Sequence, residues 1–258
     1  MQRWALGGVL LFAIACGGSG GGETEGAMAP PLSPLADGWA SAYVDDGVRI
    51  GCDDARADLE SSDAPRIEVD DAVIFVGYEQ IGDNQNPIVA RFDGDAQTWC
   101  ARHETEGPDG RALGITWDGG PDAYVVYTVV GGGSSLESAA GAGWLTAYAP
   151  GAISGGGPKV SYVGRVGIDD GALRSGTFII SVKSDNKVNS HSPSGAVVVR
   201  EDGNIEFRGS SAHKPIDLGV VAMDCTDYPF ESRYVFPPDL STPVCADCTN
   251  CSSAQPCD

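Results

Sequence analysis

One short sequence pattern, called the repeated phrase below, occurs four times in this chain at nearly regular intervals. Each copy has an apolar residue, any residue, a second apolar residue and then aspartate, at residues 67–70, 115–118, 166–169 and 221–224. Successive aspartates are 48, 51 and 55 residues apart. A period of this length is typical of repeat proteins in which each copy forms one small sheet. The sequence therefore predicts four related copies, but it contains no motif that identifies a reaction.

The pattern of residues 38–237 predicts an all-β domain. Short runs of β-branched and aromatic residues are separated by Gly, Asp, Pro and Asn, and no useful helical period occurs. Four strands can be placed in every copy: 39–44, 48–52, 67–70 and 72–78; 88–92, 96–101, 115–118 and 123–130; 144–148, 159–163, 166–169 and 177–182; 197–200, 204–207, 221–224 and 232–236. This inventory predicts a small β-propeller of four repeats of about 50 residues. A β-sandwich or an open β-solenoid would use the same strands.

The second copy, residues 88–130, carries a family resemblance. It contains a strand that ends in Phe-Asp-Gly-Asp, a strand with Trp99, the run Gly-Ile-Thr-Trp-Asp and then Ala-Tyr-Val-Val-Tyr. This order resembles the SBBP-like repeats of secreted bacterial β-propellers. The resemblance implies a propeller architecture. It implies no active site, because such repeats occur in proteins of many functions.

The N-terminus predicts export. Arg3 precedes an apolar run, residues 5–15, that is too short to remain as a membrane-spanning helix. The run ends in Ala-Ile-Ala before Cys16, which resembles a bacterial lipobox and implies cleavage before Cys16 and lipid on that residue. The alternative is an ordinary secretory signal with an incidental cysteine. Residues 16–37, rich in Gly and then in Pro, predict a tether. We therefore expect a protein lipid-anchored to the bacterial cell envelope, in the outer membrane.

The charge balance narrows the choice of partners. The chain has 36 acidic and 16 basic residues, a net charge of −20. Such a field repels phosphate groups, so nucleic acid is not expected as a partner. An envelope protein, a glycan or a cation remains a possible partner. The excess of acidic residues is equally explained by a role in solubility alone.

The four repeat aspartates, Asp70, Asp118, Asp169 and Asp224, allow two interpretations. An aspartate directly after a strand usually accepts a hydrogen bond from the backbone two residues on and so forms the turn. The alternative is a ring of carboxylates around a cation such as Ca²⁺. That ring would need something positive at its centre, because four close carboxylates cannot all remain ionised alone.

The cysteines other than Cys16 number seven, and export favours disulfides among them. An odd number leaves at least one thiol without a partner in the chain. Cys52 and Cys100 occupy matching positions in successive copies. In neighbouring propeller blades these positions are expected to lie too far apart for a direct bond.

The segment 238–258 forms a Cys-rich tail. It contains Cys245, Cys248, Cys251 and Cys257, and we expect disulfides to pin it, with Cys225 as the partner of one tail cysteine. A metal bound by the tail thiolates is the alternative.

The sequence thus predicts a signal peptide at 1–15, a tether at 16–37, a repeat domain at 38–237 and the tail. The expected function is that of a non-catalytic envelope lipoprotein whose domain binds, or serves as a scaffold for, a protein, glycan or cation. No cofactor is expected under this reading, and no catalytic residue can be singled out. The alternatives are a propeller-type hydrolase with paired carboxylates, and a metal or redox protein that acts through the tail.

Overall fold

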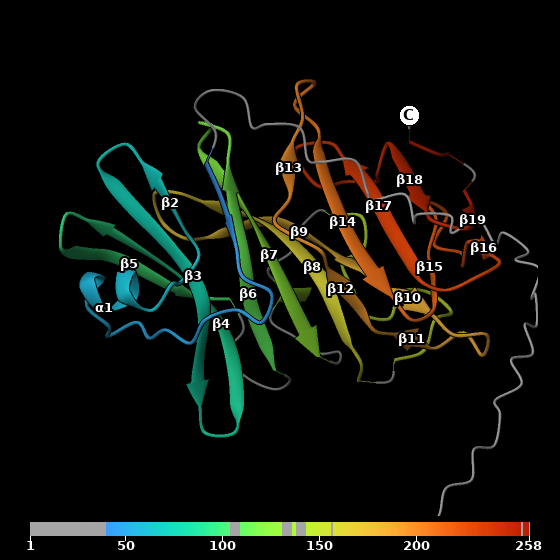
Figure 1. Ribbon diagram of the computed structural model, residues 1–258, viewed down its shortest axis with the longest axis horizontal. Helices are drawn as coiled ribbons and strands as arrows, with labels where there is room; N and C mark the ends of the chain where they lie inside the picture. Colours follow the sequence, from blue (N-terminus) through green and yellow to red (C-terminus); the bar gives the residue numbers. More distant parts are fainter. Residues whose placement is uncertain are drawn as a thin grey trace, which may run out of the picture. The chain divides into compact units, whose positions relative to one another are not determined.

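The computed structural model describes residues 40–103, 109–130, 136–137, 143–155, 157–253 and 255–257. The chain divides into two units, residues 1–33 and 34–258, and all described residues belong to the second. This unit is built from antiparallel sheets (Figure 1). The prediction of an all-β fold is therefore confirmed, while the predicted signal peptide, Cys16 and the tether lie outside the described residues.

Three larger sheets and two small ones make up the second unit. The N-terminal sheet consists, in spatial order, of β2 (Arg66–Val69), β3 (Ala72–Ile81), β4 (Asn84–Asp93) and β5 (Ala96–Arg102). The central sheet consists of β1 (Ala40–Tyr43), β6 (Gly110–Trp117), β7 (Asp122–Val130), β8 (Lys159–Gly167) and β9 (Leu173–Ile179). The C-terminal sheet consists of β12 (His191–Pro193), β14 (Ile205–Ser211), β17 (Phe230–Phe236) and β18 (Cys245–Cys248), and β13 (Val198–Val199) also pairs with β14. The small sheets are β11 (Val188–Asn189), β10 (Ser181–Val182) and β15 (Lys214–Pro215), and the pair β16 (Asp224–Cys225) and β19 (Cys251–Ser252).

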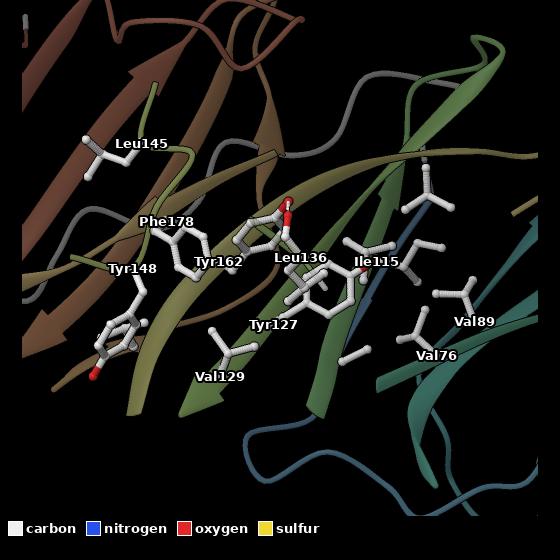
Figure 2. Close-up of a cluster of buried hydrophobic side chains, with 14 of the residues drawn as sticks. Val76, Val89, Ile115, Tyr127, Val129, Leu136, Leu145, Tyr148, Tyr162 and Phe178 are labelled. Atoms are coloured by element: carbon white, nitrogen blue, oxygen red, sulfur yellow. Dashed lines mark hydrogen bonds between the residues drawn. The ribbon is translucent and has the colours of Figure 1, made fainter. Parts of the chain in front are cut away.

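The central sheet has a core on each face. Successive side chains of a strand point to opposite faces, and on β7 Ala123, Val125 and Tyr127 pack with the N-terminal sheet, whereas Tyr124 and Val126 pack with the C-terminal sheet. Figure 2 shows the first of these cores, in which side chains from the N-terminal sheet lie beside those of β6 and β7. Because both faces are covered, β7 is buried continuously from Asp122 to Val129 rather than at alternate residues.

The outer face of the N-terminal sheet is covered by the helix α1 (Arg56–Ser61), in which only Leu59 is buried. Phe75 and Phe92 pack edge to face beneath it. A disulfide between Cys52 and Cys100 fastens the segment before α1 to β5, with 5.7 Å between the Cα atoms. The expectation that these two cysteines lie too far apart is wrong, because they belong to one sheet and its covering segment, not to two neighbouring blades.

The four copies do not form one sheet each. β4 and β5, from the second copy, complete the sheet begun by β2 and β3 of the first, whereas β6 and β7 of the second copy lie in the central sheet. That sheet also contains β8 and β9, from the third copy. Among the described residues no sheet closes on itself. The boundaries between the sheets therefore fall inside the copies rather than between them.

Several expected strands also differ from the structure. Two strands are expected at 159–163 and 166–169, but one strand, β8, runs from Lys159 to Gly167, with a shift of register near Arg165. Residues 144–148 form bends that cover the central sheet near Phe178, and residues 221–223 form a loop. The apolar residues of these two segments are packed or line a surface, but they belong to no β-ladder. The hydrophobic pattern alone does not distinguish such segments from strands. None of the helices in the described part of the chain is long and apolar enough to cross a bilayer.

Candidate functional site

A cavity of about 780 Å³ lies beside the small sheet of β10, β11 and β15. Four segments line it: the turn at 150–153, the turn at 182–186, residues 213–214 and the loop at 219–222, together with Phe230 at the start of β17. We refer to it below as the β10 cavity. Its volume lies within the usual range of small-molecule sites, roughly 300–1,000 Å³.

Backbone hydrogen bonds fix the two turns on one side of the cavity. The Asn186 N–H donates to the Lys183 carbonyl at 3.0 Å, and Asn186 occupies the left-handed region with φ 61°. The Asn186 side-chain amide then donates to the carbonyl of Ala152 in the neighbouring turn at 2.9 Å. Asparagine tolerates this backbone conformation better than most residues. The two turns are thus joined into one rim.

The loop on the other side is held by Asp217. Its carboxylate accepts hydrogen bonds from the N–H groups of Gly219 and Val221 at 2.9 and 3.1 Å. Between them, Val220 has φ 61°. A β-branched residue in this region is a rare outlier, with a cost of order 1–3 kcal/mol, and such residues concentrate at functional sites. The strained residue lies in the wall of the β10 cavity.

The lining is apolar with a basic edge. Ile153, Val182 and Phe230 contribute apolar surface, and none of the described lining residues is acidic, although the chain as a whole carries a net charge of −20. Lys214 lies 3.7 Å from the Asp224 carboxylate. Among the described residues Lys183 makes no ion pair within 4.0 Å, although its charge helps to lower the pKa of Asp185.

Exposed hydrophobic side chains gather at the same place. Val221, in the lining, is 61% exposed. Tyr228 is 70% exposed, and its ring packs edge to face on Phe230 with 6.1 Å between centroids. Exposed apolar groups around a concave opening are typical of binding sites.

None of the four repeat aspartates lines this cavity, although Asp224 pairs with Lys214 in its lining. Asp70 lies in the turn between β2 and β3, and Asp118 in the turn between β6 and β7, where its carboxylate accepts a hydrogen bond from the Gly120 N–H at 3.0 Å. Asp169 follows β8, and Asp224 lies within β16. Only three of the four therefore follow a strand. Within the described residues the structure does not gather these four carboxylates into a group that could hold a metal ion, so the expected ring is absent there.

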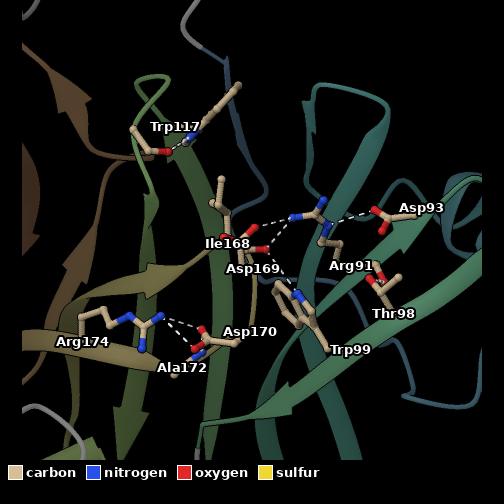
Figure 3. A network of polar contacts seen from close by, with 11 residues as sticks. Arg91, Asp93, Thr98, Trp99, Trp117, Ile168, Asp169, Asp170, Ala172 and Arg174 are labelled. Carbon is tan, nitrogen blue, oxygen red and sulfur yellow. Dashed lines mark hydrogen bonds and ion pairs between the residues drawn. The ribbon is translucent and has the colours of Figure 1, made fainter.

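The surroundings of Asp169 show what one of these turns contributes. Figure 3 shows the β8–β9 turn in contact with the N-terminal sheet. Arg91 donates to the carbonyl of Ile168 at 2.9 Å and lies 3.4 Å from the Asp169 carboxylate. The indole N–H of Trp99 donates to the same carbonyl at 3.2 Å. The turn therefore fastens the central sheet to the N-terminal sheet.

The tail cysteines form two disulfides. Cys225 is bonded to Cys251, and Cys245 to Cys257, while Cys248 is a buried free thiol. The tail is no separate segment, because β18 extends the C-terminal sheet through its pairing with β17. Within the described residues, one group of three potential metal ligands lies within 4.8 Å, and it consists of Cys225, Cys248 and Cys251.

Two buried histidines have structural partners. His191 is fully buried between the central and C-terminal sheets, where its ring nitrogens lie 3.0 Å from Ser161 Oγ and 2.8 Å from Ser232 Oγ. Burial lowers the pKa of His191 to about 3. His103 contacts the Tyr127 hydroxyl at 2.7 Å, and burial lowers its pKa as well. Neither lines the β10 cavity. The serines beside His191 are buried with it, so this Ser-His-Ser arrangement offers no accessible nucleophile.

The carboxyl groups with a shifted pKa do not behave as general acids. Hydrogen bonds lower the pKa values of Asp170, Asp185, Asp202 and Asp239, with donors from the backbone of Ala172 and Asn204 or from Lys187 and Ser241. A general acid in glycoside hydrolysis requires a shift in the opposite direction.

A comparison with models of protein families finds no family that matches the sequence, and a search of curated proteins finds no similar chain. The candidate site therefore rests on geometry alone. Sequence reasoning missed the β10 cavity entirely. The sequence shows only two separate pairs of basic residues, Lys183 with Lys187 and His213 with Lys214, and no local pattern joins them.

Proposed function

We propose that this protein is an exported, lipid-anchored envelope protein whose β domain binds a small amphiphilic anion in the β10 cavity. The observation that carries the proposal is the combination of an apolar cavity with Lys183 at its edge, a lysine that makes no ion pair within 4.0 Å among the described residues. The cavity volume of about 780 Å³ suits a small ligand rather than a polymer.

The chemistry of the lining defines the ligand. Ile153, Val182 and Phe230 favour an apolar body, since burial of apolar surface contributes about 25 cal/mol per Å². Lys183 favours an anionic group at the edge of the cavity. The rest of the chain repels anions through its net charge, so this basic edge gives the site its preference.

The cellular setting comes from the N-terminal sequence. The apolar run before Cys16 and the Gly/Pro-rich residues after it support a lipid anchor with a tether. The three disulfides fit an oxidising compartment. A tethered binding domain would hold its ligand at the membrane surface.

Binding of the dye 1-anilinonaphthalene-8-sulfonate, which is both apolar and anionic, tests the proposal. We expect saturable fluorescence enhancement by the folded protein, and weaker enhancement with the uncharged analogue N-phenyl-1-naphthylamine. Lys183→Gln should weaken dye binding roughly two- to fivefold, because one partly exposed ion pair contributes about that factor to a binding constant. Val221→Asp should weaken it further, because it places a carboxylate in the lining.

Two matched variants serve as controls. Lys187→Gln removes a lysine from the same turn that pairs with Asp185 at 3.0 Å and does not line the cavity. Val244→Asp changes another exposed hydrophobic residue outside the cavity. Equal weakening by Lys187→Gln and Lys183→Gln would place the dye elsewhere and contradict the proposal. Circular dichroism of each variant would show that dye binding reports the folded domain.

A further inference from the structure

Three sulfur atoms meet where the tail joins the rest of the domain. Cys225 in β16 and Cys251 in β19 face each other directly in the ladder and are joined by a disulfide. Cys248, the last residue of β18, is a free thiol. The three Sγ atoms all lie within 4.8 Å of one another. A free thiol is therefore held beside an existing disulfide.

The turn between β18 and β19 places Cys248 close to Cys251. Only Thr249 and Asn250 separate the two cysteines, and Asn250 has φ 61°. Both sulfurs approach one carbonyl oxygen, that of Thr249, at 3.4 and 3.5 Å. Residues at the two ends of a β-turn have Cα atoms less than about 7 Å apart, which overlaps the range that disulfides span. Cys251 thus has two suitable partners, Cys225 and Cys248.

We propose that Cys225, Cys248 and Cys251 form a thiol–disulfide exchange site in which Cys251 bonds alternately to Cys225 and to Cys248. The Cys248 thiol loses its proton, and the thiolate attacks Cys251 Sγ. A Cys248–Cys251 bond forms, the Cys225–Cys251 bond breaks, and Cys225 leaves as a thiolate that takes up a proton. The number of disulfides is unchanged, so the step needs no oxidant or reductant.

The surroundings of each sulfur set the resting state. Burial, together with the charges of Glu231 and Asp247, raises the pKa of the Cys248 thiol to about 12. A protonated thiol is a poor nucleophile, so the Cys225–Cys251 bond persists in the closed form. Cys225 is only partly buried, and after exchange its thiol is the more accessible one. Opening of the tail turn would therefore accelerate both exchange and trapping of Cys225.

Exchange would detach the tail from β16. Cys225 directly follows Asp224, which pairs with Lys214 in the lining of the β10 cavity. In the exchanged form the Cys245–Cys257 disulfide still closes the tail on itself, but no covalent bond joins β19 to β16. The proposal concerns this bond alone and does not depend on the ligand of the cavity.

Trapping of thiols in the native, unreduced protein tests the exchange. The full chain is incubated with N-ethylmaleimide at mildly alkaline pH and then digested with a protease that cleaves before aspartate. This protease is needed because no Lys or Arg follows Arg233, whereas Asp224, Asp227, Asp239 and Asp247 allow cleavage. Cys225 is then recovered apart from the peptide that contains Cys248 and Cys251, and fragmentation of that peptide assigns its sulfurs.

The expected result is maleimide on Cys225, increasing with time, together with a Cys248–Cys251 disulfide. Label confined to Cys248 at the end point would overturn the proposal. Label on Cys251 with a Cys225–Cys248 disulfide would overturn it as well, because it would place the attack on the other sulfur. The peptide that contains Cys16 is read separately.

Two variants give an independent test. Cys225→Ser should yield a Cys248–Cys251 disulfide and leave no thiol in the tail, whereas two labelled thiols at these positions would contradict exchange. Cys248→Ser should keep the Cys225–Cys251 bond and show no label at Cys225. An intact Cys52–Cys100 disulfide and an unchanged near-ultraviolet spectrum show that each variant is folded. If Cys225→Ser does not fold, the trapping experiment on the unaltered protein decides alone.

Discussion

At the scale of single residues, His191 shows how a polar group is accommodated between two cores. Its ring connects Ser161 on the central sheet to Ser232 on the C-terminal sheet. A neutral imidazole can donate from one nitrogen and accept at the other, and each serine hydroxyl can do either. Gly209 is required beside it, because a Cβ there would overlap the imidazole ring. The site accepts neutral histidine and penalises the charged form.

This penalty predicts a pH dependence of stability. The pKa of His191 is about 3 in the folded protein and about 6.5 in the unfolded chain, so its contribution is fully present above pH 6.5 and is lost as the pH falls towards 3. Between pH 7 and pH 5 the free energy of unfolding should fall by about 2 kcal/mol through this residue. Urea unfolding at both pH values should show a smaller fall for His191→Asn. An equal fall in both proteins would contradict the assignment.

At the scale of elements, the sequence pattern located most strands but not their partners. Expected strands at 72–78, 88–92, 96–101 and 123–130 correspond to β3, β4, β5 and β7. Short runs of β-branched and aromatic residues, bounded by turn residues, make such strands visible. Their assignment to sheets depends on distant pairings, such as β1 with β6, that no local pattern encodes. The repeated phrase suggested equivalent copies, yet in the fourth copy Val221 and Ala222 line the cavity and Asp224 lies within β16.

The cavity could not be predicted for the same reason. Its lining residues come from four separated segments, and each alone resembles an ordinary turn. The unusual backbone of Val220 depends on hydrogen bonds to Asp217 and is not visible in the apolar pair Val220 and Val221. By contrast, the choice of cysteines as disulfide formers needed only composition and an exported setting.

The disulfides should differ in what they contribute. Cys52–Cys100 closes a sequence separation of 48, and Cys245–Cys257 one of 12. Chain-entropy arguments assign about 4 and about 3 kcal/mol to loops of these lengths. The double variant Cys52→Ser/Cys100→Ser should therefore unfold at a lower urea concentration than Cys245→Ser/Cys257→Ser. The reverse order would show that strain or residual structure, rather than loop length, governs their effects.

At the scale of the whole molecule, the prediction concerns its place in the cell. If Cys16 carries lipid, the protein expressed in a bacterium with lipoprotein-processing enzymes should enter the detergent phase of a Triton X-114 extraction. Cys16→Ala should move it to the aqueous phase or leave an uncleaved precursor. Cys248→Ser, which removes a different thiol, should partition like the unaltered protein. Equal partitioning of the Cys16→Ala variant would contradict a lipid anchor at this residue.

The burial of β7 on both faces has a consequence for how the domain loses its structure. Neighbouring residues of this strand, such as Val125 and Val126, belong to different cores, and its two edges are occupied by β6 and β8. Neither outer sheet can separate without exposing one side of the same strand. The unfolding of one core therefore destabilises the other. The sheets of this domain should unfold in one cooperative transition rather than one after another.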